Sequence, residues 1–279
     1  MAELRTVFAI IPAAEAVEAA VAAFQALPLS DRARLVGVHV APLAVTFGLA
    51  TDIALASFIE AQIAAADEER KAAEAEFAKA ARRTGIDFGW RAEKSPDNLV
   101  SPHAGAMSRA ADIILYPQVR PEVSIGRHQI EEVVFTSGRP VIGLPAGWLV
   151  KTLGRRVLIA WDGGREVARA VFDALPLLAK AEAVRIVSVQ GFLDDPVRQF
   201  THGDDIAMTL SRHGARVETS TFKSTRPNMR DELKAQALDF GADLAVMGCY
   251  GHSRFRERIL GGVSRSMLND MPLPLLLAN

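Results

Sequence analysis

Short apolar runs alternate along this chain with longer segments in which apolar residues recur at helical spacing. In the second half, the short β-rich runs are 157–161, 184–189, 216–223, 243–248 and a last run, 272–279, which closes the chain. The segments with helical spacing between them are 165–181, 204–214, 226–241 (with Asn228 as the expected N-cap) and 264–271. Strands that alternate with helices predict a parallel sheet covered by helices on both faces.

The first half repeats this order. Its expected strands are 6–11, 34–40, 88–94, 112–117 and 140–145, and its expected helices are 13–27, 58–84, 99–111 and 129–138. We therefore expect an α/β fold made of two tandem, doubly wound parallel-sheet domains, each Rossmann-like and five-stranded.

The two halves can be laid on one another. Residues 111–115 match 242–246 with an offset of 131, and Pro140 matches Pro272. The first strands match at Val7 and Val157, with an offset of 150. The two offsets differ by about 19 residues, which indicates an insertion in the first half near 41–66. A repeat this long indicates a domain duplication rather than a solenoid. The expected domains are 1–147 and 154–279, joined by a short linker.

Composition narrows the class of protein. The chain has 279 residues, of which 49% are hydrophobic and 23% charged, and its net charge is −1. Basic residues are therefore not in excess, whereas nucleic-acid-binding proteins carry such an excess to contact phosphates. A single cysteine, Cys249, excludes an internal disulfide. The most apolar long stretch, 41–66, carries Asp52 and Glu60 and does not predict a membrane span. The N-terminus has no signal-peptide pattern, so we expect a cytoplasmic protein.

One segment of the second half carries recognisable chemistry. A buried strand ends at Met247, and Gly248 and Gly251 follow, then nine residues, then Gly261-Gly262-Val263-Ser264. Ligands of open parallel sheets bind beyond the carboxyl ends of the strands. Glycines there allow a tight turn and a close approach of the backbone. The glycine pair precedes a helix whose first amides form an anion site, and Ser264 is placed to cap that helix or to donate to a phosphate.

This pattern, a buried strand followed by G-x2-G-x9-G, resembles the nucleotide signature of the universal stress protein family. The opening VLIAWDGG and the last, proline-containing strand are also similar to that family. The resemblance implies ATP as the ligand, with Mg²⁺ as its accompanying cation. It implies that Asp162 contacts the nucleoside and that Val189 lies near the adenine. The residues implied to hold the ribose and phosphates are Gly248, Gly251, Gly261, Gly262 and Val263.

The sequence departs from the family pattern in two places. Gly262 stands where the ATP-binding members have Ser or Thr, so a hydroxyl donor worth about 0.5–1.5 kcal/mol is missing. That loss weakens binding by about tenfold at most, unless Ser264 substitutes. The first half lacks the paired glycines after Tyr116-Pro117, and its first strand ends in Pro12-Ala13-Ala14 without an aspartate. We therefore predict that the first half binds no nucleotide in this manner.

Simpler interpretations stay open for each feature. The glycine loop also fits a plain turn before a helix, and Asp162 fits a cap of the helix that follows it. Cys249 and His252 fit structural positions. Three loop arginines, Arg254, Arg256 and Arg258, fit a solvated surface as well as phosphate neutralisation. The histidines show no metal-ligand spacing, so no metal site is predicted.

Three functions fit these observations. The first is a stress-response protein that binds an adenine nucleotide in its second half and uses binding as a signal. The second is a stress scaffold or interaction protein without nucleotide, and the third is a slow ATPase. No P-loop, dinucleotide fingerprint or nucleophile elbow is found, and no residue is identified that would position an attacking water. The sequence therefore assigns no catalytic residue and favours binding over catalysis. We expect the halves to pack as an intramolecular pseudo-dimer, and the chain to be able to form a homodimer.

Overall fold

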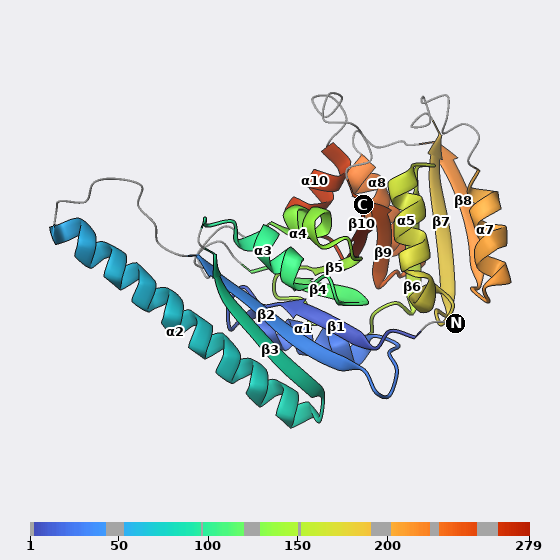
Figure 1. Cartoon of the computed structure of the whole chain (residues 1–279). Coiled ribbons are helices and arrows are strands. Elements are labelled where there is room, and N and C mark those ends of the chain that lie inside the picture. Colours follow the sequence, from blue (N-terminus) through green and yellow to red (C-terminus); the bar gives the residue numbers. More distant parts are fainter. Residues whose placement is uncertain are drawn as a thin grey trace.

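The computed structural model describes residues 3–42, 53–95, 97–119, 129–149, 152–190, 202–223, 229–249 and 262–279. Within these residues ten strands form one sheet (Figure 1). The strands are β1 (Thr6–Ile10), β2 (Arg34–Pro42), β3 (Asp87–Ser95), β4 (Ile113–Pro117), β5 (Val141–Leu144), β6 (Arg156–Trp161), β7 (Ala183–Gln190), β8 (Val217–Lys223), β9 (Leu244–Gly248) and β10 (Leu275–Ala278). Each lies within two or three residues of a run that the apolar pattern predicts.

The order of the strands shows the duplication. It is β3-β2-β1-β4-β5 in the first half and β10-β9-β6-β7-β8 in the second, so each half is a five-stranded doubly wound unit. Neighbouring strands are parallel except β5 and β10, which pair antiparallel and join the halves edge to edge. The expected α/β fold of two tandem parallel-sheet units is confirmed, and the two sheets are continuous rather than separate.

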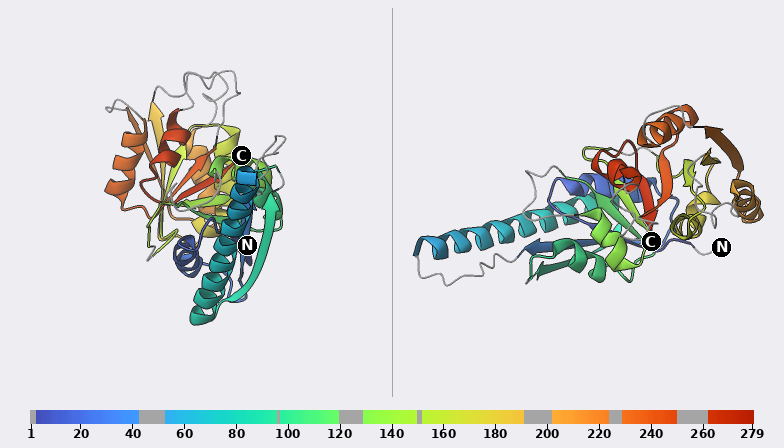
Figure 2. Two further views of the ribbon diagram at one scale, coloured as in Figure 1. Left: turned by 90° about the vertical axis from the view of Figure 1, so that its left-hand side faces the viewer. Right: turned by 90° about the horizontal axis from the view of Figure 1, so that it is seen from above.

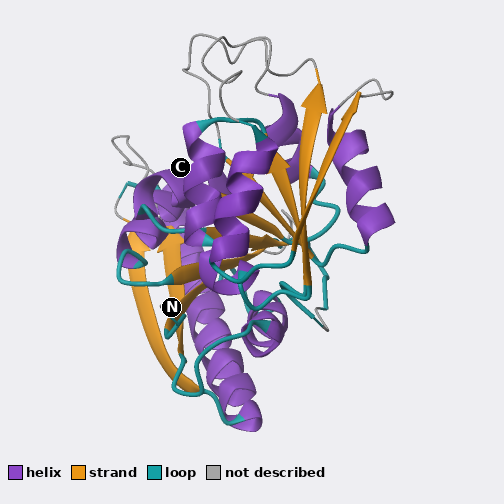
Figure 3. Ribbon diagram, turned by 90° about the vertical axis from the view of Figure 1, so that its right-hand side faces the viewer, coloured by secondary structure: helices purple, strands orange, loops and turns teal. Residues whose placement is uncertain are grey.

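Helices cover both faces of this sheet (Figures 2 and 3). One face carries α1 (Ala16–Ala26), α2 (Ile53–Thr84), α5 (Arg165–Asp173), α6 (Leu175–Leu178) and α7 (Gly203–Arg212). The other carries α3 (Val100–Met107), α4 (Ile130–Ser137), α8 (Met229–Phe240) and α10 (Gly262–Asn269). The helix expected over 165–181 is divided into α5 and α6. Pro176 lies at the start of α6, and a proline cannot supply the amide that would continue the preceding helix. The predicted N-cap Asn228 lies outside the described residues.

The core runs without a break through both halves. On one face, Val7 and Ile113 of the first half belong to the same buried cluster as Val157 and Leu244 of the second. The opposite face holds a second such cluster. Strands buried on both faces require apolar side chains at every position, which is why the sequence shows runs rather than alternation.

Two aspartates confirm the predicted match between the halves. The carboxylate of Asp112 accepts hydrogen bonds from the backbone amides of Arg5 and Thr6, at 2.8 and 2.9 Å. The carboxylate of Asp243 accepts three amide hydrogen bonds at 3.1 Å, from Gly154, Arg155 and Arg156. Each aspartate therefore ties the start of the first strand of its half to the start of the fourth.

The predicted match of Pro140 with Pro272 is wrong by two residues. The carbonyl of Pro140 accepts a hydrogen bond from the amide of Ile114 at 2.9 Å, and the carbonyl of Pro274 accepts the equivalent bond from Ala245, also at 2.9 Å. The structural counterpart of Pro140 is therefore Pro274. Both prolines precede a last strand, so residue type alone did not distinguish them.

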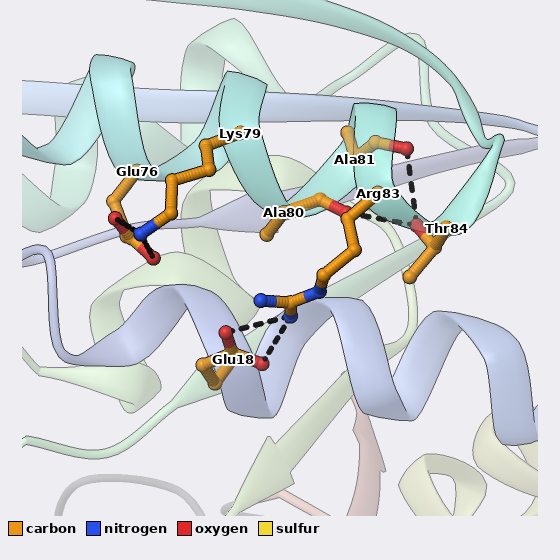
Figure 4. A network of polar contacts seen from close by, with 7 residues as sticks. All are labelled: Glu18, Glu76, Lys79, Ala80, Ala81, Arg83 and Thr84. Atoms are coloured by element: carbon orange, nitrogen blue, oxygen red, sulfur yellow. Dashed lines mark hydrogen bonds and ion pairs between the residues drawn. The ribbon is translucent and has the colours of Figure 1, made fainter.

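The long helix α2 extends past the sheet at its N-terminal end (Figures 1 and 2). It starts five residues before the predicted boundary, at Ile53. Its C-terminal part is tied to α1 by an ion pair in which Arg83 contacts Glu18 at 2.8 Å (Figure 4). Within the helix, Lys79 pairs with Glu76, and the Thr84 hydroxyl donates to the carbonyls one turn earlier. Among the described residues, no helix is both long and apolar enough to cross a membrane.

Candidate functional site

The carboxyl ends of three parallel strands meet at one edge of the second half. Ile159 of β6 pairs with Val246 of β9, and Trp161 of β6 pairs with Ser188 of β7. Asp162 follows β6, Val189 is the next residue of β7, and Gly248 ends β9. The sheet therefore brings these three predicted site residues to one edge, where open parallel sheets bind their ligands.

Asp162 forms the turn that leads from β6 into α5. Its Oδ1 accepts a hydrogen bond from the amide of Gly164 at 2.9 Å. The residue between them, Gly163, has a φ of +72°, a left-handed conformation that favours glycine. Gly164 is the N-cap of α5. This is a side-chain-closed turn of the Asx type, so the carboxylate shapes the approach to the helix from just outside it.

Gly248 is fixed by the first turn of α5. A Cβ built on Gly248 would lie 2.6 Å from the backbone nitrogen of Val167 and 2.9 Å from the carbonyl carbon and the Cβ of Glu166. Contacts that short do not occur, so the position requires glycine for the strand and the helix to approach each other. The described structure thus gives Gly248 a packing role, in addition to the ligand role that the sequence predicts.

A buried carboxylate that was not among the predicted site residues lies beside this contact. The side chain of Glu166, in the first turn of α5, is only 6% exposed and forms an ion pair with Nε of Arg165 at 2.6 Å. A carboxylate near the N-terminus of a helix is favoured by the helix dipole. The acidic first turn was visible in the sequence. Its burial against β9 was not, because a charged residue next to an arginine usually marks a surface.

Cys249, directly after β9, is engaged within the fold. Its amide donates to the carbonyl of Ala278 at 3.0 Å, and its carbonyl accepts from Nδ2 of Asn279 at 2.7 Å. Burial raises the pKa of the Cys249 thiol to about 12, and the negative charge of Glu131 adds to the shift. The amide of Cys249 is therefore not available to a ligand, and its thiol is a core group, as the structural interpretation predicts.

The helix expected after the glycine pair is present as α10. It begins at Gly262 and has Val263 and Ser264 in its first turn. The remaining predicted positions, Gly251 and Gly261, lie outside the described residues, as do His252 and the three loop arginines. Met247 is buried and pairs with Leu277 of β10. The site residues of the glycine loop thus stay predictions, supported at both ends by the strand and the helix that frame it.

At the equivalent edge of the first half, the described residues at the ends of β1 and β4 are apolar and buried. Pro117 ends β4 at the position of Gly248, and it is buried. The loop after β1 has Ile11 and Ala13 buried. His39, 2% exposed, holds this loop, because its Nδ1 donates to the carbonyl of Ile11 at 2.8 Å. These contacts favour the prediction that the first half does not bind nucleotide as the second half would.

The described histidines and carboxylates form no metal centre. No group of three or more histidine, cysteine, aspartate or glutamate side chains converges within the described ranges. The Nε2 of His103 contacts Oδ1 of Asp97 at 2.9 Å. Hydrogen bonds from the amide of Leu99, the hydroxyl of Ser95 and His103 lower the pKa of the Asp97 carboxyl. This is a local contact at the start of α3, on the first half.

Comparisons with known proteins agree with this geometry. The model of the "Universal stress protein family" matches residues 154–279. A universal stress protein from Archaeoglobus fulgidus DSM 4304 has the same fold with a TM-score of 0.70 at 18% identity, over 98% of this chain and 96% of that one. A putative universal stress protein from Pseudomonas aeruginosa UCBPP-PA14 gives a TM-score of 0.58 at 13% identity, over 99% and 93%.

A functionally unknown protein from Pseudomonas aeruginosa PAO1 gives a TM-score of 0.58 at 12% identity, over 99% of this chain and 92% of that one. No match was found among curated proteins. The structural likenesses show the fold, and the family model assigns residues 154–279 to the family. Residues 154–279 therefore form a domain of the universal stress protein family, in a chain whose whole length has the fold of solved structures described as universal stress proteins.

Proposed function

We propose that this chain is a cytoplasmic stress-response protein whose second half binds an adenine nucleotide, with ATP as the ligand and Mg²⁺ as its accompanying cation. The nucleotide would lie at the edge where β6, β7 and β9 end, with its nucleoside beside Asp162 and Val189. Its phosphates would face the glycine loop and the first turn of α10.

One observation carries this proposal. The chain leaves β9 at the carboxyl edge of the sheet and, after the glycine loop, begins α10 at Gly262. The first amides of a helix have no partner within the helix and carry a partial positive charge, so they favour a phosphate. Glycine at the first position keeps side-chain atoms away from those amides.

The proposal makes binding, rather than turnover, the function. Among the described residues of this edge, the carboxylates of Asp162 and Glu166 are engaged by Gly164 and Arg165. A residue that activates water needs a proton acceptor directed at the ligand. We therefore place the protein among nucleotide-responsive binding proteins. Homodimerisation of the tandem chain would be the means of passing the signal on.

Mass spectrometry of small molecules released from freshly purified protein tests the proposal. We expect an adenine nucleotide at a substantial fraction of one equivalent, and equilibrium titration with ATP should give one site per chain. Protein that releases none and that does not bind added ATP at millimolar concentration would overturn the nucleotide function.

A scaffold without nucleotide is the second candidate. Two observations favour it: the amide of Cys249 is already bonded to Ala278, and Gly262 offers no hydroxyl to a phosphate. The same mass spectrum separates the candidates, because a scaffold would be purified with no nucleotide and would not bind it on titration.

A further inference from the structure

The first half contacts the far end of the helix that follows the glycine loop. Gln118 is the residue directly after β4, and its Nε2 donates a hydrogen bond to the carbonyl of Leu268 at 2.7 Å. Leu268 is the last residue but one of α10. The carbonyls of the last turn of a helix have no partner within the helix. A side chain of one half therefore completes the hydrogen bonding of a helix in the other.

Gln118 occupies the position in the first half that Cys249 occupies in the second. The amide of Gln118 donates to the carbonyl of Leu144 at 2.9 Å, as the amide of Cys249 donates to that of Ala278 at 3.0 Å. In the second half this position opens the glycine loop. In the first half the same backbone position, held in the same way, directs a side chain across to α10.

An apolar contact between the halves lies beside this hydrogen bond. A Cβ built on Gly143 of β5 would lie 2.8 Å from Cε of Met271 and 2.7 Å from Cδ1 of Ile130. Met271 follows α10 after one residue and is buried. Met267 and Leu268 of α10 are buried in the cluster that also holds Ile130. The C-terminal end of α10 is thus held by the first half through one polar contact and one close apolar contact.

We propose that Gln118 is a positioning residue for the nucleotide site, through which the first half sets the place of α10 and of the amides in its first turn. The inference rests on the proposed function. An eight-residue helix is short and stiff, so a shift at its C-terminal end is passed to its N-terminal end. The half that lacks the glycine loop thereby controls how well the other half is arranged to hold a phosphate.

Substitutions in the full-length chain test this role. Gln118→Glu keeps the shape of the side chain but, when ionised, presents no donor to the carbonyl. Gln118→Lys keeps a donor, and a cation near a helix C-terminus is favourable. Gln236→Ala is the matched control, because it removes a glutamine hydrogen bond, to Glu232 at 3.3 Å, within α8.

We expect Gln118→Glu to raise the Kd for ATP about five- to tenfold, because one hydrogen bond to an ordered group is lost. Gln118→Lys and Gln236→Ala should stay within about twofold of the wild type. Gly143→Ala, which should displace Met271, is expected to raise the Kd in the same direction. Amide hydrogen exchange of residues 262–270, measured without nucleotide, should speed up in Gln118→Glu and not in Gln118→Lys.

The outcomes separate this inference from the proposed function. A wild-type chain that binds no ATP overturns the nucleotide site, and the exchange rates of 262–270 still decide whether Gln118 holds α10. If the wild type binds ATP and Gln118→Glu has an unchanged Kd, the positioning role is overturned, even if that variant unfolds at lower urea. Unchanged exchange in α10 overturns it as well.

Discussion

Gly248 and Val167 lie so close together that the strand and the helix they belong to touch through backbone atoms. A Cβ on Gly248 would lie 2.6 Å from the nitrogen of Val167. The end of β9 and the first turn of α5 therefore form one rigid corner at the carboxyl edge of the sheet. The glycine loop leaves from this corner, so its starting point is fixed by packing before any ligand binds.

This contact predicts that Gly248→Ala is destabilising. The added methyl group meets backbone atoms that cannot rotate away, and overpacking of this kind costs about 1–3 kcal/mol. Urea unfolding of the full-length chain measures the loss. Gly203→Ala is the control. The added Cβ there would lie 3.1 Å from the hydroxyl oxygen of Ser188, and that side chain can rotate away. Alanine also has a higher helix propensity than glycine, which favours α7. Equal stability of Gly248→Ala and the wild type would contradict the packing role.

A second prediction follows from the paired aspartates of the two halves. Asp243→Ala leaves three backbone amides without their acceptor, whereas Asp112→Ala leaves two. Each hydrogen bond to a charged acceptor contributes at most about 1.5–3 kcal/mol to the free energy of unfolding. We therefore expect Asp243→Ala to lower that free energy more than Asp112→Ala does.

Thermal unfolding of both variants checks the ranking of the aspartates. Asp239→Ala is the control, since the carboxylate of Asp239 is exposed and its ion pair with Arg185 is worth little. A cost of Asp243→Ala no greater than that of Asp239→Ala would show that the three amide bonds do not stabilise the fold.

Cys249 is expected to be unreactive in the folded chain. Its pKa is raised to about 12, chiefly by burial, so the nucleophilic thiolate is scarce at pH 8. A thiol reagent should label it only when the protein unfolds in urea. Because the unfolded chain gives up this proton at lower pH than the folded chain, the group also lowers stability as pH rises above the ordinary pKa of a thiol. Rapid labelling of native protein would contradict the burial.

Because His39 is buried, we expect the free energy of unfolding to fall at acid pH. Burial lowers its pKa, the charge of Arg70 lowers it further, and the hydrogen bond to Ile11 opposes the shift. The folded chain thus binds the proton less readily than the unfolded chain. Stability should therefore fall as pH drops below the ordinary histidine pKa of about 6.5.

Urea unfolding between pH 8 and 5 measures this effect against His39→Gln, which keeps a side-chain donor and does not titrate. We expect the variant to lose less stability over that range than the wild type. Identical pH profiles for the two proteins would mean that His39 does not contribute.

The inner strands were predictable from sequence because they are buried on both faces and are therefore apolar almost throughout. The run 112–117 reads as a strand from its own residues, and β4 spans Ile113–Pro117. The joining of β5 to β10 was not predictable, since nothing in 140–145 indicates which edge it will meet. Gly248 was noted for its spacing to Gly251, but its contact with Val167 depends on a helix some 80 residues earlier. The cross-half bond of Gln118 is hidden for the same reason.

Calorimetric titration with ATP decides whether the glycine loop of the second half holds an adenine nucleotide. Gly251→Val places a branched side chain on the loop, and Gly126→Val makes the same change in the corresponding segment of the first half. We expect one site in the wild type and in Gly126→Val, and a Kd at least tenfold higher in Gly251→Val. Equal affinity of all three proteins for ATP, or no binding by any of them, would contradict a nucleotide site on this loop.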